Sequence, residues 1–97
     1  MTAYLFSEIV THDPTLLDEY RTIARKAVAE FGGSYLVRNQ IPEILEGTVG
    51  DDVKVVILGF DTLDAARAFY RSDTYAPAID VAAKCMSRRI LIVDGGD

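Results

Sequence analysis

The chain has little of what several classes of site require: 97 residues contain one cysteine, one histidine and no tryptophan. A single cysteine, Cys85, cannot form an intramolecular disulfide and is typical of a reducing compartment. One histidine and one cysteine cannot supply the ligand spacing of a zinc site, so we expect no metal. No apolar run approaches the roughly 18 residues of a membrane-spanning helix. We also expect no signal peptide. These absences predict a cytoplasmic protein without a membrane partner.

Positive charge is also scarce, because 10 Lys and Arg face 15 Asp and Glu, for a net charge of −5. The acidic residues are spread along the chain without a block of like charges. A nucleic-acid partner requires a basic face, so we expect none. Hydrophobic residues at 49% and charged residues at 26% are ordinary for a globular protein. The length predicts a single domain over residues 1–97.

The spacing of apolar residues predicts elements in the order β-α-β-β-α-β. Strands are expected at Ala3–Val10, Ser34–Arg38, Val53–Phe60 and Arg88–Val93. Helices are expected from Pro14 to Phe31, from a cap at Asp61 or Thr62 to Tyr70, and, after a break at Ser72-Asp73, from about Thr74 to Cys85. Pro42 interrupts the second strand, which therefore belongs at a sheet edge or carries a bulge. The pattern leaves open whether that strand resumes through Ile44–Glu46.

With right-handed crossovers, this order predicts an α+β, ferredoxin-like fold: a four-stranded antiparallel sheet with both helices on one face. The strand at Val53–Phe60 is apolar on both faces, and Ile90–Val93 repeats the pattern. A bare apolar sheet face would exceed the patch size that monomers usually expose. The simplest cover is the same face of a second copy, which predicts a homodimer through the outer sheet face. In the other interpretation, the loops and tail of the chain shield a twisted sheet.

Several stretches carry a family resemblance in their order and spacing. They are Asp13-Pro14 with Tyr20, Gly32–Arg38, Glu43–Gly47, Ala65–Ser72 and Tyr75. Together, from about Ala3 to Gly95, they resemble the domain-of-unknown-function 1330 family, which is grouped with the dimeric α/β-barrel proteins. The resemblance implies a ferredoxin-like protomer, a dimer with sheets packed back to back, and a pocket between sheet and helices. It implies no established activity, because the wider superfamily includes monooxygenases, haem-degrading enzymes and proteins without known chemistry.

The chain departs from the family pattern at two places. Many members follow the strand-two arginine with Gly-Gly, whereas this chain has Asn39-Gln40. Members often carry an arginine about two helical turns after the equivalent of Tyr75, where this chain has Ala82. If that arginine serves an anionic ligand in other members, this chain has lost the role or moved it.

Glu8 is the first candidate for chemistry. It lies in a predicted central strand between apolar neighbours, where a lone carboxylate is costly to bury. It therefore needs a partner, with Arg38 and the tyrosines as the nearest donors in the predicted topology, or a raised pKa that suits a general acid or base. The structural interpretation is an ion pair or a contact at the dimer seam. The functional interpretation makes Glu8 catalytic.

Arg38 and His12 are further candidates. Arg38 is the only cation in the predicted second strand, and its planar guanidinium suits a carboxylate, either that of Glu8 or that of a ligand. His12, the single histidine, lies at the predicted first strand-to-helix turn beside Asp13 and is a candidate base. The plainer interpretations are a salt bridge at a sheet edge for Arg38 and an exposed turn residue for His12.

Five tyrosines and four phenylalanines suit the wall of a small-ligand pocket, although core packing accounts for most aromatic residues at helical spacing. Tyr20, Tyr70 and Tyr75 are the exceptions, because a buried hydroxyl needs a hydrogen-bond partner. With Arg38, they are the predicted ligand-binding residues. Cys85 has no histidine nearby in the sequence and is expected to be inert packing.

Two functions follow from these residues. The preferred prediction is a small-molecule-binding or non-catalytic module with a pocket between sheet and helices. The alternative is an enzyme without cofactor that performs proton transfer, isomerisation or monooxygenation on a small aromatic or carbonyl compound. In that alternative Glu8 is the acid or base, while Arg38 and tyrosine hydroxyls orient the substrate. The lack of tryptophan argues against haem degradation, and Gly32-Gly33 ends a helix rather than forming a phosphate loop.

Overall fold

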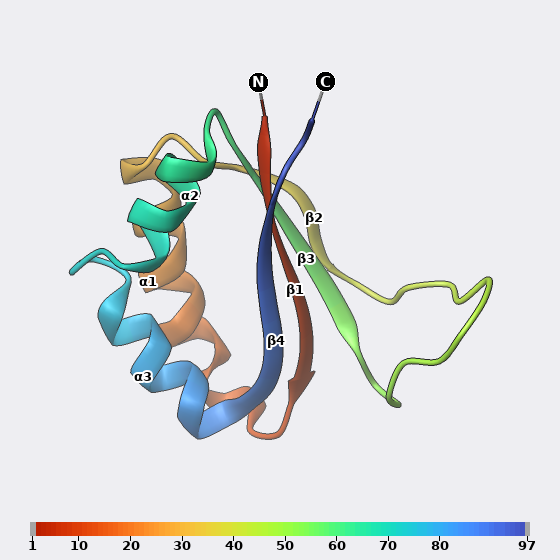
Figure 1. The fold of residues 1–97 in the computed structure, drawn as a ribbon. Coiled ribbons are helices and arrows are strands. Elements are labelled where there is room, and N and C mark those ends of the chain that lie inside the picture. Colours follow the sequence, from red (N-terminus) through yellow and green to blue (C-terminus); the bar gives the residue numbers. More distant parts are fainter. Residues whose placement is uncertain (1, 97) are drawn as a thin grey trace.

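Four strands and three α-helices form the fold of residues 2–96, which are the residues that the computed structural model describes (Figure 1). Met1 and Asp97 of the predicted 1–97 domain lie outside them. The elements are β1 (Ala3–Thr11), a 3₁₀ turn η1 (Pro14–Leu16), α1 (Leu17–Glu30), β2 (Ser34–Gln40), β3 (Lys54–Phe60), α2 (Leu63–Tyr70), α3 (Ala76–Cys85) and β4 (Met86–Asp94). The antiparallel sheet has the order β2-β3-β1-β4, and the helices cover one of its faces. The predicted ferredoxin-like fold is confirmed.

Local capping explains where the helices begin and end. The Asp13 carboxylate accepts a hydrogen bond from the backbone N–H of Thr15 at 3.0 Å, at the start of η1. Gly32, with φ of +70°, follows α1 in the left-handed conformation that glycine adopts at low cost. The Thr62 hydroxyl accepts from the N–H of Ala65 at 3.0 Å, so the cap predicted at Asp61 or Thr62 is Thr62.

The predicted break at Ser72-Asp73 separates α2 from α3. The Ser72 hydroxyl donates to the carbonyl of Phe69 at 2.8 Å and accepts from the N–H of Tyr75 at 3.1 Å. These two bonds satisfy backbone groups that the end of α2 would otherwise leave unpaired. The turn also directs Tyr75 into the interior, where its exposed fraction is 2%.

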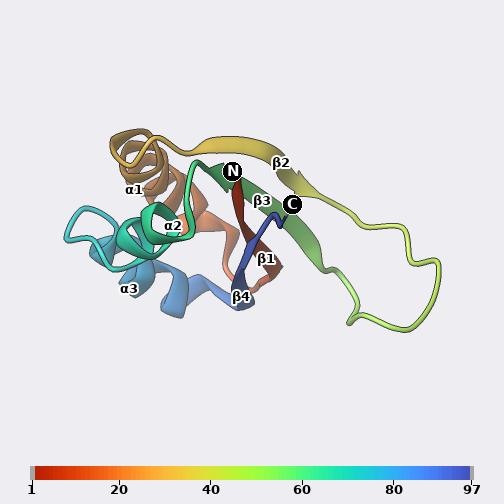
Figure 2. The same ribbon diagram turned by 45° about the horizontal axis from the view of Figure 1, so that its top comes forward.

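The connection between β2 and β3, residues 41–53, contains no strand, so the second strand does not resume through Ile44–Glu46. Figure 2 shows this segment extending away from the sheet. It exposes apolar side chains, with Ile41 79% and Leu45 86% exposed. These side chains find no apolar cover within the described chain.

Asn39 follows Arg38, at the place where the sequence departs from the Gly-Gly of the family that it resembles. Its φ of +56° lies in the left-handed region, next to a register shift between Val37 and Gln40 in the pairing of β2 with β3. Asparagine tolerates this conformation better than most residues. The local backbone therefore takes a glycine-like conformation without glycine.

The pleat of β1 sends consecutive side chains to opposite faces of the sheet. Its Ala3, Leu5, Ser7 and Ile9 are buried toward the helices, whereas the residues between them are half-buried on the outer face. The core joins strand residues to all three helices through Leu5, Leu58, Phe60, Ala27, Phe69 and Ala78. Each helix therefore covers the same sheet face through small or aromatic side chains.

No helix among residues 2–96 is both long and apolar enough to cross a membrane. The cytoplasmic location stays a prediction.

Gly33 provides a test of the packing between α1 and the sheet. A Cβ at this position would lie 2.7 Å from the Phe60 ring and 2.9 Å from a Val28 methyl group. Because both neighbours are buried, we expect Gly33→Ala to lower the free energy of unfolding by about 1–3 kcal/mol in a urea melt. Gly50→Ala is the matched control, since its Cβ would meet nothing closer than 3.7 Å. Equal stability of the two variants would contradict the packing described here.

Candidate functional site

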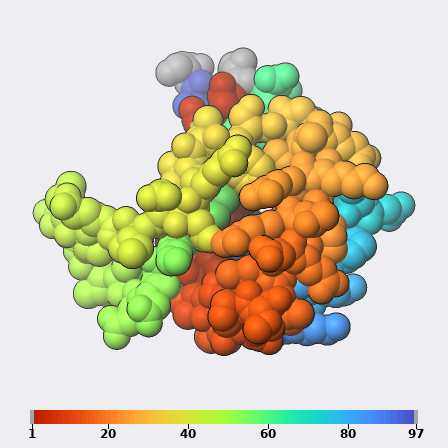
Figure 3. Space-filling view, turned by 180° about the vertical axis from the view of Figure 1, so that it is seen from behind, coloured from red at the N-terminus to blue at the C-terminus, as the bar shows by residue number. Residues whose placement is uncertain are grey.

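A cleft of about 100 Å³ opens between α1 and β2 and reaches the inner face of β1. Figure 3 shows the surface hollowed between the yellow atoms of β2 and the orange atoms of α1. Its walls are mainly apolar and come from β1, β3, α1 and α2, through Leu5, Ile9, Val28, Val56, Leu58 and Phe69. A cleft of this size and polarity suits part of a small organic molecule.

Ser7 places a hydroxyl in the inner part of this cleft. The residue is 4% exposed and lines the cleft from the centre of β1. It makes no side-chain hydrogen bond within residues 2–96, and no fully buried side-chain oxygen there lacks a partner. The small exposed area of Ser7 therefore includes its hydroxyl, which is available to a molecule in the cleft.

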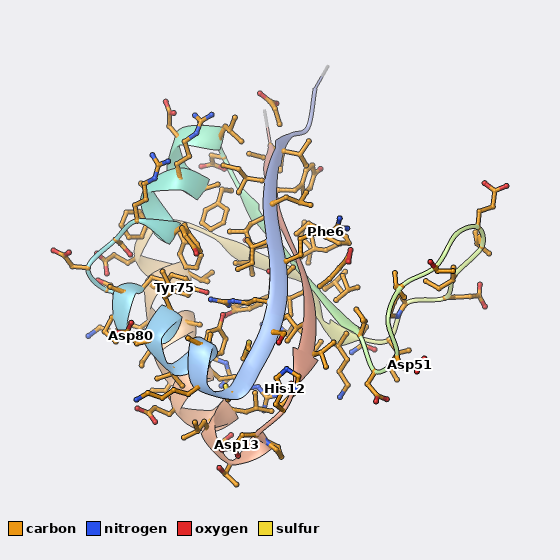
Figure 4. The ribbon with its side chains drawn as sticks, turned by 60° about the horizontal axis from the view of Figure 1, so that its bottom comes forward. Phe6, His12, Asp13, Asp51, Tyr75 and Asp80 are labelled. Carbon is orange, nitrogen blue, oxygen red and sulfur yellow. The ribbon has the colours of Figure 1, made fainter. Side chains whose placement is uncertain are left out.

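Tyr20 of α1, Tyr75 at the start of α3 and Arg88 of β4 form one hydrogen-bonded cluster. The two hydroxyls are 2.8 Å apart, and the Arg88 guanidinium donates to Tyr20 at 2.8 Å and to Tyr75 at 3.0 Å. Both tyrosines also line the cleft. Figure 4 shows Tyr75 between the helices and the sheet. The guanidinium beside Tyr75 is that of Arg88, from β4. Ala82 of α3, the position at which the sequence lacks the arginine of the family pattern, is packed in the core.

Burial raises the pKa of Tyr75 well above its usual value of 10.0, and Tyr20 adds to the shift, while the Arg88 guanidinium opposes it. Tyr75 therefore keeps its proton at neutral pH. It can donate a hydrogen bond, and it is a poor base.

Three arginines lie around the opening of the cleft. Arg21 and Arg25 stand one turn apart on α1, and Arg38 faces them from β2. The Arg38 guanidinium lies over the Tyr35 ring, 4.8 Å from its centroid, in a cation–π contact. The opening is thus basic although the whole chain is acidic.

Residues 2–96 match the family described as Domain of unknown function (DUF1330). The chain belongs to this family. The DUF1330 assignment confirms the resemblance seen in Gly32–Arg38 and Ala65–Ser72 and carries no activity with it. No curated protein matches the chain significantly.

Solved structures similar to this DUF1330 protein share its fold at low sequence identity. A protein of unknown function from Rhodopseudomonas palustris has a TM-score of 0.78 and 13% identity over 99% of this chain and 83% of that chain. SnoaB, a cofactor-independent oxygenase from Streptomyces nogalater, has a TM-score of 0.61 and 13% identity over 99% and 94%. A dimeric protein of unknown function and ferredoxin-like fold from Bacteroides fragilis has a TM-score of 0.63 and 12% identity over 96% and 95%. At these identities the likeness shows the fold alone.

The structure separates Glu8 from the cleft. Its carboxylate accepts a hydrogen bond from the Arg89 guanidinium at 2.6 Å, in the register where β1 faces β4. The predicted pairing with Arg38 is wrong, because Glu8 points to the outer face while Arg38 lines the cleft on the helical side. Phe6, two residues before Glu8 on the same face, lies across the sheet from Tyr75 (Figure 4).

The other predicted site residues divide between the cleft and the rest of the surface. Tyr20, Arg38 and Tyr75 line the cleft, whereas Tyr70 lines a separate groove between α2 and β4. The His12 ring Nε2 lies 2.7 Å from the Ser87 hydroxyl at an exposed turn. Cys85 is fully buried. Within residues 2–96 no group of His, Cys, Asp or Glu is arranged to hold a metal ion.

Sequence reasoning missed four residues of the site: Ser7, Arg21, Arg25 and Arg88. Ser7 carried a usable signal, because it is the single polar residue among Ala3, Leu5 and Ile9 on one face of the strand. The arginines of α1 carried none, since exposed helical arginines are common.

Tyr75→Phe tests the cluster. Removing one hydroxyl deprives Arg88 and Tyr20 of one hydrogen bond each and leaves only the bond between them at 2.8 Å, so we expect a loss of about 1–3 kcal/mol in the free energy of unfolding. Tyr70→Phe is the matched control, because Tyr70 is 38% exposed, and we expect a change within about 0.5 kcal/mol. Urea melts at neutral pH compare the two variants.

The raised pKa of Tyr75 predicts a pH dependence as well. The unfolded chain releases the tyrosine proton as pH rises past 10.0, while the folded chain retains it. The stabilisation is therefore complete below pH 10.0 and is lost as pH rises from there toward the folded pKa. We expect Tyr75→Phe to reduce the fall in stability above pH 10.0, measured by urea melts at stepped pH. An unchanged slope would contradict the burial of this hydroxyl.

Proposed function

We propose that this DUF1330 protein binds a small organic molecule in the cleft between α1 and the sheet. The observation that carries the proposal is the Ser7 hydroxyl, which lies in a mainly apolar cleft without a protein partner. The hydroxyl reaches only this narrow, mainly apolar cleft, and a ligand with one polar group would give it a hydrogen-bond partner there. Apolar walls with a few convergent polar groups are typical of small-molecule sites.

The composition of the cleft favours binding over acid–base catalysis. Its lining residues within 2–96 include no Asp, Glu or His. Glu8 and His12, the candidate acid and base, lie on the outer face and at an exposed turn. Tyr75 retains its proton and cannot serve as a base near neutral pH.

The alternative, a cofactor-independent enzyme, rests on the cluster of Tyr20, Tyr75 and Arg88. These groups donate hydrogen bonds at the wall of the cleft and would stabilise negative charge that develops on a carbonyl oxygen. One structural neighbour is described as a cofactor-independent oxygenase. In such an enzyme Tyr75→Phe would abolish turnover, whereas in a binding module it would change affinity alone.

Binding can be tested by amide NMR titration with neutral aromatic compounds, namely phenol, benzyl alcohol and benzamide. We expect shift changes around the cleft, at Ser7, Tyr35, Val56 and Leu58, and none in the α2–β4 groove. Ser7→Ala should weaken binding of phenol about 5-fold, the effect of one neutral hydrogen bond. Ser34→Ala, at an exposed position of β2, is the control. Scattered shift changes, or equal affinities of the two variants, would count against the proposed site.

We further propose that the protein is a homodimer through the outer sheet face. That face carries exposed apolar side chains, with Leu36 53%, Leu91 40% and Val93 49% exposed. Its one carboxylate on β1, that of Glu8, is paired with Arg89, so the face can be covered without leaving this charge unpaired. A structural neighbour is described as dimeric. The projecting 41–53 segment offers further apolar surface to a partner copy (Figure 2).

Light scattering at micromolar concentration tests the dimer. We expect about twice the chain mass of 10.7 kDa, because a two-fold axis would let the apolar outer faces of two copies cover each other. Leu91→Lys should shift the protein toward the monomer, since it places a cation in the apolar face. Ala68→Lys, on the exposed side of α2, should leave the mass unchanged. A wild-type monomer would reject this assembly.

A further inference from the structure

The charge around the cleft is opposite in sign to the charge of the chain. The lining residues include Arg21, Arg25 and Arg38 and, within residues 2–96, no carboxylate. The chain as a whole has 15 acidic residues and a net charge of −5. Three cations that line one cleft, with no carboxylate among its lining residues, therefore do not follow from the composition of the chain.

These cations are largely without protein partners. Within residues 2–96, neither Arg25 nor Arg38 forms a salt bridge, and Arg21 reaches Asp18 only at 4.0 Å. The Asp18 side chain is fully exposed, so this pair contributes little. The contact with Tyr35 orients the Arg38 guanidinium and leaves its N–H groups free to donate.

Arg88 adds an independent cation behind the cleft wall. It is half-buried, and its guanidinium donates to the hydroxyls of Tyr20 and Tyr75 rather than to a carboxylate. Its hydrogen-bond partners in the described chain are hydroxyls, and no salt bridge of residues 2–96 involves Arg88, so its charge has no anionic partner there. Because the two tyrosines form part of the cleft wall, the positive potential of Arg88 extends to the ligand site.

We infer that the ligand of the cleft is a small organic acid, with an apolar or aromatic body and a carboxylate that lies among Arg21, Arg25 and Arg38. This inference rests on the proposed function. The planar guanidinium matches a carboxylate in a bidentate arrangement, and a charged acceptor gives stronger hydrogen bonds than a neutral one. The body of the acid packs against Leu58 and its neighbours in the cleft, toward the Ser7 hydroxyl.

The charge of the ligand can be varied on a constant ring with benzoate, benzamide and benzylamine. In amide NMR titrations at about 0.05 M salt, we expect benzoate to bind at least about 5-fold more tightly than benzamide. Benzylamine should cause no shift changes in the cleft. Raising the salt to about 0.5 M should weaken the binding of benzoate and leave the affinity for benzamide unchanged, because salt screens exposed charges.

Substitutions then locate the charge. Arg25→Gln and Arg38→Gln should each weaken the binding of benzoate about 5-fold or more. The affinity of each variant for benzamide should stay within about twofold of the wild-type value. Arg67→Gln is the control, since Arg67 lies on α2 and is paired with Asp64 outside the cleft. Heteronuclear spectra of each variant verify that it is folded.

The outcomes separate this inference from the proposed function. Equal affinity for benzoate and benzamide, or tighter binding of benzylamine, overturns the inference that the ligand is an acid. In that case the cleft is still a ligand site. Loss of benzoate binding in Arg67→Gln as large as in Arg38→Gln overturns the placement of the carboxylate. No shift change in the cleft with any of the three compounds overturns both proposals.

Discussion

The alternation of side chains along β1 is the constraint on which the rest of the structure depends. As a central strand, β1 is paired on both sides, and these pairings leave no freedom to slip by one residue. Ser7 must therefore face the helices, and Glu8, its direct neighbour, must face away. The same rule acts on β4, where Arg88 points inward to two tyrosines and Arg89 points outward to Glu8. Two adjacent residues thus serve two different surfaces, and the chemistry of the cleft stays separate from that of the outer face.

The separation explains how an acidic chain holds a basic cleft. Most acidic side chains lie in loops and on exposed helix surfaces, where water screens them. The cations at the cleft come from α1, β2 and β4, which the tertiary structure brings together around Tyr20 and Tyr75. Net charge describes the long-range field of a protein and says little about one site. The local charge decides which ligand the cleft favours.

The outer face has a different balance. It combines half-buried apolar residues with a single ion pair, and a segment with exposed Ile41 and Leu45 extends from its edge. Such a surface is costly to leave in water and inexpensive to bury, because its one carboxylate on β1 already has a cation. Binding of a ligand on one side of the sheet and of a second copy on the other would use the two faces of β1 independently.

Much of the fold was predictable from the sequence, because its signals are local. Asp13, Gly32, Thr62 and Ser72 mark helix boundaries through hydrogen bonds or conformations that involve residues within four positions. The order of elements then leaves few topologies. The candidate site was predictable only in part. Tyr20, Tyr75 and Arg38, which line the cleft, could be predicted because tyrosine hydroxyls at core positions and a single cation in a strand stand out in the sequence. The partner of Glu8 and the role of Arg88 were not visible, because they depend on the register between strands about 80 positions apart. The sequence by itself determined which residues form strands and helices. The tertiary structure alone decided which of two adjacent arginines, Arg88 or Arg89, bonds to the tyrosines of the cleft wall, because only strand pairing assigns each residue to a face.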